Sequence, residues 1–118
     1  MTRRRLELGA GGENHAAAYL KKQGYQIIES NWRCRLGEID LIAKKGCVLA
    51  VCEVKTRTTD TFGHPLEAIT PRKQARLRRL GEFYLSFVAG PDLTLRFDAI
   101  GVTAGPGGVE IDHIEGAF

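Results

Sequence analysis

Three charged side chains interrupt two of the most apolar segments of the chain. Asp40 lies within GEIDLIA, and Glu53 and Lys55 lie within VLAVCEVKT. Both segments have the character of strands, in which residues two apart share a face, so Glu53 and Lys55 should point the same way. Charges at such positions need partners, because an unpaired charge is costly to bury.

A short turn at residues 45–46 joins the two segments, so we expect a hairpin that places Asp40 close to Glu53. Strand alternation predicts that Ile39 and Leu41 share the face opposite to Asp40. Two neighbouring carboxylates repel each other and need a cation or a shared proton. One lysine supplies part of that charge. A divalent ion with oxygen ligands, Mg²⁺ or Mn²⁺, would supply the rest.

Glu13 is a further candidate, near the start of a helix predicted over residues 12–23. Ala16, Ala17 and Leu20 follow it at helical spacing and form an apolar stripe that should face the sheet. The alternative is that this acid only interacts with the helix dipole. We prefer a role in the site, because the stripe would carry the acid toward the charged residues of the strands.

An acid on a first helix, an acid on one strand and Glu-x-Lys on the next strand form a pattern that resembles the PD-(D/E)XK nuclease superfamily. More closely, the segments NWRCRLGEIDLIA, CEVKTR, FG and RFDAI resemble the small bacterial YraN-like family, related to archaeal Holliday-junction resolvases. The resemblance extends from Glu13 to Asp98, and twelve residues separate Asp40 from Glu53. One departure is Ile39, which stands where the superfamily often has proline.

The resemblance implies a restriction-endonuclease-like α/β fold and metal-dependent hydrolysis of phosphodiester bonds in branched or duplex DNA. It makes Asp40 and Glu53 metal ligands, with Glu13 as a further ligand or a base. Lys55 would orient or deprotonate the attacking water and neutralise phosphate charge. A structural ion-pair network in a small basic protein is the alternative origin of the same residues.

Positive charge is concentrated in one part of the chain. Residues 1–90 contain 16 of the 17 lysines and arginines and 9 of the 14 acids, a net charge of +7, whereas residues 91–118 have a net charge of −4. A basic body suits a polyanion such as DNA, and an uneven solvated surface is the alternative. The side chains predicted to contact phosphates are Arg33, Arg35, Arg57, Arg72, Lys73, Arg76 and Arg79.

The remaining patterns predict one domain over residues 1–118, with residues 1–10 flexible. Thr70 before Pro71 marks the start of a second helix. Helices are predicted over residues 12–23 and 70–88, and strands over residues 25–33, 37–45, 47–57, 92–102 and 108–118. The order α-β-β-β-α-β-β implies a central mixed β-sheet flanked by α-helices.

The composition excludes some classes of protein. At 43% hydrophobic residues, 118 residues can form a real core. No apolar run approaches the roughly 18–20 residues of a membrane span, so we expect no membrane association. Three cysteines without metal-ligand spacing, Cys34, Cys47 and Cys52, favour a reducing, cytoplasmic setting.

Three functions compete: an endonuclease for structured DNA, a nucleic-acid-binding module that keeps the fold without the chemistry, and an interaction domain with structural charges. The presence of all four charged site residues favours the first. The related resolvases imply a homodimer, with residues 92–100 or 113–118 as the interface. His64, in a polar loop, is a candidate for substrate contact, whereas His113 is expected to be inert. Asp98 either matches a family position or pairs with a basic side chain.

Overall fold

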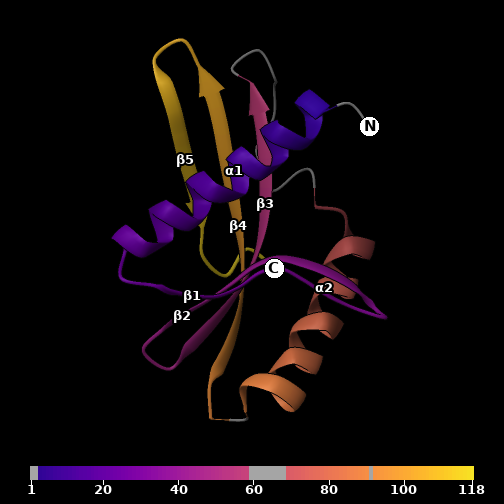
Figure 1. Ribbon diagram of the computed structural model, residues 1–118. Helices are drawn as coiled ribbons and strands as arrows, with labels where there is room; N and C mark the ends of the chain where they lie inside the picture. The colour runs from indigo at the N-terminus through magenta and orange to yellow at the C-terminus, as the bar shows by residue number, and fades with distance from the viewer. Residues whose placement is uncertain (1–2, 59–68, 91) are drawn as a thin grey trace.

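The computed structural model describes residues 3–58, 69–90 and 92–118, with side chains from Gly11 onward. The predicted loop residue His64 lies outside this range. The order α-β-β-β-α-β-β is confirmed (Figure 1). The elements are α1 (Arg3–Lys22), β1 (Gln26–Cys34), β2 (Gly37–Lys45), β3 (Val48–Thr58), α2 (Pro71–Tyr84), a π-helical turn η2 (Leu85–Ala89), β4 (Thr94–Gly105) and β5 (Gly108–Ile114).

The five strands form one mixed sheet in the order β1-β2-β3-β4-β5. Strands β3 and β4 are parallel, and α2 lies in the connection between them; the other neighbouring strands are antiparallel. A parallel pair needs such a crossover, whereas antiparallel pairs are joined by short turns. The predicted mixed sheet flanked by helices is confirmed, and the architecture is consistent with a restriction-endonuclease-like fold.

The two segments proposed as a dimer interface are both used within the chain. Strand β4 pairs with β3 along residues 94–104, and β5 pairs with it from Ala99 onward, so residues 99–100 already have a strand on both sides. In the other segment, the Ala117 N–H donates to the Phe97 carbonyl at 2.7 Å, and the Phe118 ring packs 5.5 Å from that of Phe97. The homodimer with one of these segments as its interface stays a prediction.

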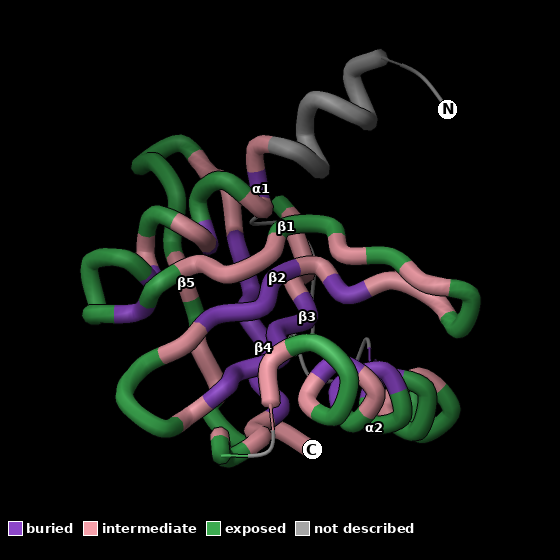
Figure 2. The backbone as a smooth tube through the Cα atoms, turned by 60° about the horizontal axis from the view of Figure 1, so that its bottom comes forward, coloured by how far each residue is buried: buried purple, intermediate pink, exposed green. Residues whose placement is uncertain are grey.

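The helices cover opposite faces of the sheet and create two cores. Val51 of β3 packs in a cluster with Leu77 of α2, and the next residue, Cys52, packs in a cluster with Leu20 of α1. All four side chains are at most 2% exposed. Fully burying a leucine contributes on the order of 2 kcal/mol, so each face stabilises the sheet. Figure 2 shows the buried residues concentrated in the central strands and on the inner side of α2.

Strands β1 and β2 leave the main sheet and reach toward α2 (Figure 1). The pairing of β2 with β3 ends at Leu41 and Cys52, whereas its pairing with β1 continues to Gly37. At that end, a Cβ on Gly37 would lie 3.3 Å from the Leu80 side chain. Ile39 therefore packs in the α2 cluster and Leu41 in the α1 cluster. The prediction that these two share one face was wrong, because the hairpin turns around α2 where it leaves β3.

Helix α1 starts earlier than predicted, at Arg3, so residues 3–10, expected to be flexible, belong to the helix. It approaches β3 closely, because a Cβ on Gly12 would lie only 1.9 Å from Thr56 Oγ1. Glycine is therefore needed at this crossing, which sets the position of the neighbouring Glu13. No helix in the described part of the chain combines the length and the apolar character needed to cross a membrane.

Candidate active site

Asp40 occupies the fork where β2 separates from β3. Beyond Leu41 and Cys52 the two strands no longer pair, so the backbone N–H of Val54 has no backbone carbonyl of β2 as its partner. The Asp40 carboxylate takes that place, and its Oδ2 accepts a hydrogen bond from the Val54 N–H at 2.8 Å. The Asp40 carboxylate therefore lies where the pairing of β2 with β3 ends, and it faces the part of β3 that carries Glu53 and Lys55.

Glu53 is held between two lysines from different elements. Its side chain is 7% exposed, and its Oε1 lies 2.5 Å from Lys73 Nζ and 3.4 Å from Lys55 Nζ. Lys55 comes from the same strand two residues later, as strand alternation predicts. Lys73 comes from the first turn of α2. The structure therefore brings a buried carboxylate and two ammonium groups together.

The start of α2 positions Lys73 through local interactions. Thr70 caps the helix, because its Oγ1 accepts a hydrogen bond from the Lys73 N–H at 3.2 Å, and Pro71 occupies the first turn. Proline has the φ angle of a helix already fixed and lacks only an N–H that would find no partner there. The predicted cap is confirmed, and it fixes the backbone from which the lysine reaches Glu53.

The charges of this cluster do not balance at Asp40. Burial is the main cause that raises the pKa of the Asp40 carboxyl, to about 7, and the negative charges of Glu53 and Glu13 add to it. The Val54 hydrogen bond and the charge of Lys73 work in the opposite direction but do not overcome these effects. An acid that keeps its proton near neutral pH is one that lacks a cation.

The two lysines differ in their response to this environment. Burial lowers the pKa of Lys55, and the neighbouring Lys73 adds to that effect. Burial acts in the same direction on Lys73 and is the largest single cause, but the hydrogen bonds to Glu53 and Lys55 and the charges of Glu53 and Asp40 together raise the pKa of Lys73. Lys73 is therefore the firm ion-pair partner of Glu53, and Lys55 is the lysine that gives up its proton more readily.

Glu13 is electrostatically connected to the site but belongs to the other layer. Its charge acts on the pKa of Asp40, yet α1 packs on the face of the sheet that carries Cys52, whereas Glu53 faces α2. Among the described residues, no three Cys, His, Asp or Glu side chains gather closely enough to hold a metal ion. The structure does not bring the three predicted ligands Glu13, Asp40 and Glu53 into one group.

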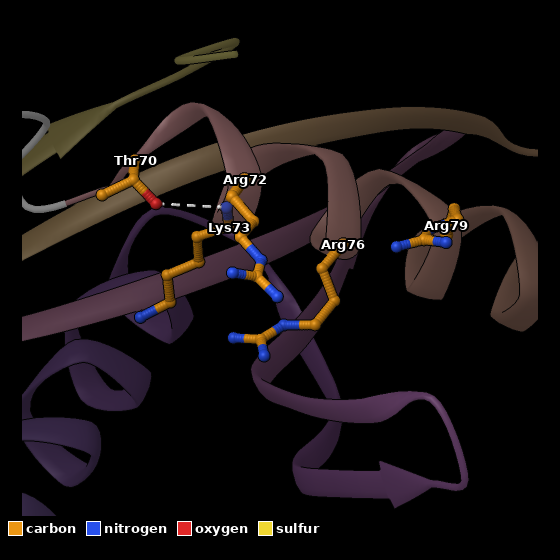
Figure 3. A pocket seen from close by; sticks show the side chains of 5 residues that line it. All are labelled: Thr70, Arg72, Lys73, Arg76 and Arg79. Carbon is orange, nitrogen blue, oxygen red and sulfur yellow. Dashed lines mark hydrogen bonds between the residues drawn. The ribbon is translucent and has the colours of Figure 1, made fainter.

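Basic side chains surround a pocket beside this cluster. The pocket has a volume of about 350 Å³, and Figure 3 shows its lining side chains extending from the first turns of α2. They are Thr70, Arg72, Lys73, Arg76 and Arg79. Four of the seven residues predicted to contact phosphates are thus brought together, and one of them, Lys73, also reaches Glu53.

The other three predicted phosphate contacts lie outside α2. Arg33 and Arg35 belong to the end of the β1–β2 hairpin, which packs against α2 near Arg76. Arg33 Nε lies 3.3 Å from Glu38 Oε2. Arg57 lies on β3, two residues beyond Lys55. The structure therefore places these three arginines on the hairpin and on β3, outside the group of basic side chains that lines the pocket.

The position of Lys73 could have been predicted more fully from the sequence. Lys73, Leu77, Leu80 and Tyr84 follow one another at helical spacing, and the last three are buried against the sheet. A lysine that continues a buried stripe by one turn should reach inward. By charge alone Lys73 falls into one group with the exposed arginines of the helix, and that pattern is more prominent than the apolar stripe that it continues.

A second buried polar cluster surrounds Asp98, which is fully buried. Arg96 donates to it with both Nε and Nη2, each at 2.8 Å, and the Gly116 N–H donates at 3.1 Å. His113 Nε2 lies 2.7 Å from Asp98 Oδ2. Burial acts to raise the pKa of Asp98, but these hydrogen bonds, led by that of His113, hold it below its ordinary value.

His113, which was expected to be inert in metal and acid–base chemistry, has a structural role in this network. Its side chain is 3% exposed, and its Nδ1 lies 3.2 Å from Tyr19 Oη, so it connects β5 to α1. Arg96 Nη2 donates to Tyr25 Oη at 2.5 Å, which extends the network. Of the two interpretations of Asp98, the structure supports the second, because Asp98 pairs with the basic side chain of Arg96.

Comparison with known proteins gives the family. A model of the uncharacterised protein family UPF0102 matches residues 12–102, which include both acidic strands and most of the sheet. The chain belongs to the UPF0102 family. A UPF0102 protein of Leifsonia xyli subsp. xyli is 50% identical over 111 residues, covering 93% of this chain and 94% of that protein. A UPF0102 protein of Chlorobaculum parvum is 47% identical, and the match covers 94% of this chain and 91% of that protein. The predicted YraN-like family is therefore confirmed, and the UPF0102 relatives align along nearly their whole length.

Proposed function

We propose that this UPF0102 protein is a metal-dependent endonuclease of the PD-(D/E)XK type that hydrolyses phosphodiester bonds in structured DNA. The observation that carries the proposal is the acidic pair in the fork between β2 and β3. Asp40 and Glu53 lie in a partly buried cluster whose negative charge is not fully compensated, beside a pocket lined by arginines. A cluster of this kind needs a cation, and the adjoining surface suits a polyanion.

The donor set fits a hard divalent cation such as Mg²⁺ or Mn²⁺. Magnesium is commonly held by one or two carboxylates together with water and substrate phosphates. Asp40 and Glu53 would hold it, with waters and the Val54 carbonyl as the proposed further oxygen ligands. When bound, such an ion supplies activation of water and neutralisation of phosphate charge.

Lys55 has the properties that the reaction needs from a side chain. It lies beside Glu53, and its lowered pKa lets it exchange a proton more readily than an exposed lysine does. We assign it the orientation or deprotonation of the attacking water and the neutralisation of a phosphate oxygen. Lys73 holds Glu53 in place, and Glu13 acts on the pair through its charge.

The arginines of α2 supply affinity without sequence preference. Contacts to phosphates position a nucleic acid and weaken steeply with salt, because each contact releases a counterion. Arg72, Arg76 and Arg79 line the pocket, which places these contacts next to the acidic pair. DNA is therefore the proposed partner, and cleavage should depend on ionic strength.

One observation favours a second candidate, a nucleic-acid-binding module without chemistry. The short contact between Lys73 Nζ and Glu53 Oε1 places an internal cation on one of the two carboxylates. An internal ion pair of this kind can replace a bound ion permanently. The two candidates agree on the partner and differ only in metal binding and cleavage.

A cleavage assay separates them. Wild type, Glu53→Gln and Lys55→Ala are compared on four-way junction, flap, duplex and single-stranded DNA with Mg²⁺, with Mn²⁺ and with a chelator. We expect cleavage by wild type only, with a loss of at least a hundredfold in both variants. Lys21→Ala, an exposed lysine at the other end of α1, is the matched control and should cleave normally. Equal background cleavage by wild type and Lys55→Ala would favour the binding module.

A further inference from the structure

A group of aromatic side chains lies at the end of α2 and is open to solvent. Phe87 is 76% exposed and the next residue, Val88, is 55% exposed. The Phe83 and Phe87 rings are 4.9 Å apart, and the Trp32 ring of β1 lies 6.1 Å from that of Phe83. Trp32 in turn packs edge-on against the buried Tyr84, which anchors the group to the core. An exposed phenylalanine in such a fixed position is unusual and marks a contact surface.

These rings continue the row of arginines on α2. Arg72, Arg76 and Arg79 are spaced by four and three residues, and Phe83 and Phe87 follow at further intervals of four. Residues three and four apart are neighbours on one side of a helix. The contact between the two phenylalanine rings shows that this line continues into the π-helical turn. Such turns occur frequently at functional sites.

The row therefore has two chemically different halves. The arginines from 72 to 79 extend over about 10 Å at 1.5 Å per residue. Beyond them lies an aromatic surface, in which the Phe83 and Phe87 rings are inclined to each other by 41°. Phosphates followed by bases would fit this order.

We propose that Phe83 and Phe87 form a stacking platform for unpaired bases of a nucleic acid whose phosphates are held by the α2 arginines. The inference rests on the proposed function for the class of partner, and it narrows the substrate to strands with unpaired bases: single strands, flaps and forks. Aromatic side chains bind bases by stacking, which is tolerant of sequence because every base has a π-face.

A closed duplex does not fit this surface, because its bases stack on each other and show only their edges in the grooves. A second copy of the chain also fits poorly. A two-fold dimer through this patch would bring two copies of the arginine row into one interface. Arg35 of the hairpin adds further like charge on this side of α2. Charge complementarity favours a polyanion over a copy of the same basic surface.

The test measures binding without cleavage. Fluorescence anisotropy is recorded in chelator with labelled oligothymidylate, with an abasic strand of the same length, and with a blunt duplex. We expect Phe87→Ala to weaken binding of oligothymidylate about tenfold and to leave the abasic strand and the duplex within twofold of wild type. Phe87→Tyr should restore binding, because it keeps the ring. Val88→Ala, which trims a neighbouring exposed apolar side chain, should have no effect.

A second readout uses the single tryptophan of the chain. Because Trp32 contacts Phe83, its fluorescence should change when oligothymidylate binds and should not change with the abasic strand. Equal affinity of wild type for the two strands would overturn the proposal. So would a Phe87→Ala variant that binds oligothymidylate normally but loses self-association in sedimentation, which would make the patch a dimer interface. Neither outcome depends on metal or cleavage, so the platform can fail while the nuclease assignment stands, and the reverse.

Discussion

The sheet carries two acidic clusters at adjacent positions of neighbouring strands, and their surroundings are opposite. In the parallel pairing of β3 with β4, Cys52 stands beside Asp98 and Glu53 beside Ala99. Asp98 faces the α1 layer and Glu53 faces α2. Asp98 is more deeply buried than the acidic pair, yet its pKa is lowered, whereas that of Asp40 is raised to about 7.

The difference lies in the number of donors and not in burial. Asp98 receives two hydrogen bonds from Arg96, one from a backbone N–H, and a contact from His113, so its charge is compensated within the chain. Within the described part of the chain, Asp40 receives one hydrogen bond, from a backbone N–H, and the neighbouring lysines are directed to Glu53. A carboxylate with all its hydrogen-bond donors supplied by the chain serves the structure. A carboxylate with few donors is available for a ligand.

The largest expected effect concerns the Asp98 cluster. Asp98→Ala should lower the free energy of unfolding by about 3–5 kcal/mol, because it leaves Arg96 without its partner in a buried site. Urea unfolding monitored by circular dichroism measures this. The double variant Asp98→Leu with Arg96→Met removes both charges and should recover most of the loss. If the single variant were as stable as wild type, the cluster would not be structural and the comparison would fail.

The next effect concerns the lysine that compensates Glu53. Lys73→Met should lower the free energy of unfolding by about 2 kcal/mol without metal, less than a fully buried pair because Lys73 is 25% exposed. The same variant should gain more stability than wild type on addition of Mg²⁺ or Mn²⁺, since binding to the folded state stabilises it and a competing cation is gone. Thermal melting at rising metal concentration tests both.

Lys21→Met is the control for that experiment, because Lys21 is exposed in the last turn of α1. It should change neither stability nor the response to metal. A Lys73→Met variant that loses stability but gains nothing from metal would mean that the acidic pair is a closed ion-pair network like that of Asp98.

Local sequence patterns predicted much of the fold and part of the site. Alternation in residues 37–57 gave the hairpin that brings Asp40 to the strand of Glu53, and Thr70-Pro71 gave the start of α2. The mixed sheet followed from the order of the elements. These features depend on near neighbours in the chain, which a sequence displays directly.

The features that were missed depend on contacts between distant segments. The hairpin turns toward α2, so Ile39 and Leu41 enter different cores although alternation places them on one face. One partner of Asp98, His113, is fifteen residues away on β5, and the sequence does not show that its ring turns inward to reach both Asp98 and Tyr19. The sequence around a strand aspartate does not show how many hydrogen-bond donors reach its carboxylate. The sequence alone therefore did not distinguish the Asp98 cluster from the Asp40 cluster.

The pH dependence of stability should have opposite signs for the two clusters. The pKa of Asp40 is raised in the folded state, so its ionisation favours unfolding, and stability falls as the pH rises from about 4 to about 7. The pKa of Asp98 is lowered, so its contribution is present above about pH 4 and is lost as the pH falls below that value. Comparing Asp40→Asn with wild type isolates the first group.

Asp40→Asn stays neutral, and its side-chain oxygen can still accept from the Val54 N–H. Relative to wild type in chelator, it should gain on the order of 1–2 kcal/mol between about pH 4 and about pH 8, less than the full shift of the Asp40 pKa because solvent screens a half-buried carboxyl group. Urea unfolding at several pH values measures the difference. A stability difference that is independent of pH would mean that Asp40 is already compensated.

The smallest effect tests how the acidic pair is positioned. Thr70→Ala removes the cap of α2 and should lower the free energy of unfolding by about 1 kcal/mol, because the Lys73 N–H loses its acceptor. Thr70→Ser keeps the hydroxyl and should stay within a few tenths of a kcal/mol of wild type. The cap also sets the direction from which Lys73 reaches Glu53, so Thr70→Ala should alter the response to metal as Lys73→Met does, but less strongly. The Asp98 cluster lies on the other face and is not attached to α2, so the low-pH loss of stability should be the same in both Thr70 variants. A changed response at low pH would mean that the two faces of the sheet are coupled. The difference between the pKa shifts of Asp40 and Asp98 would then not be explained by the hydrogen-bond donors around each carboxylate.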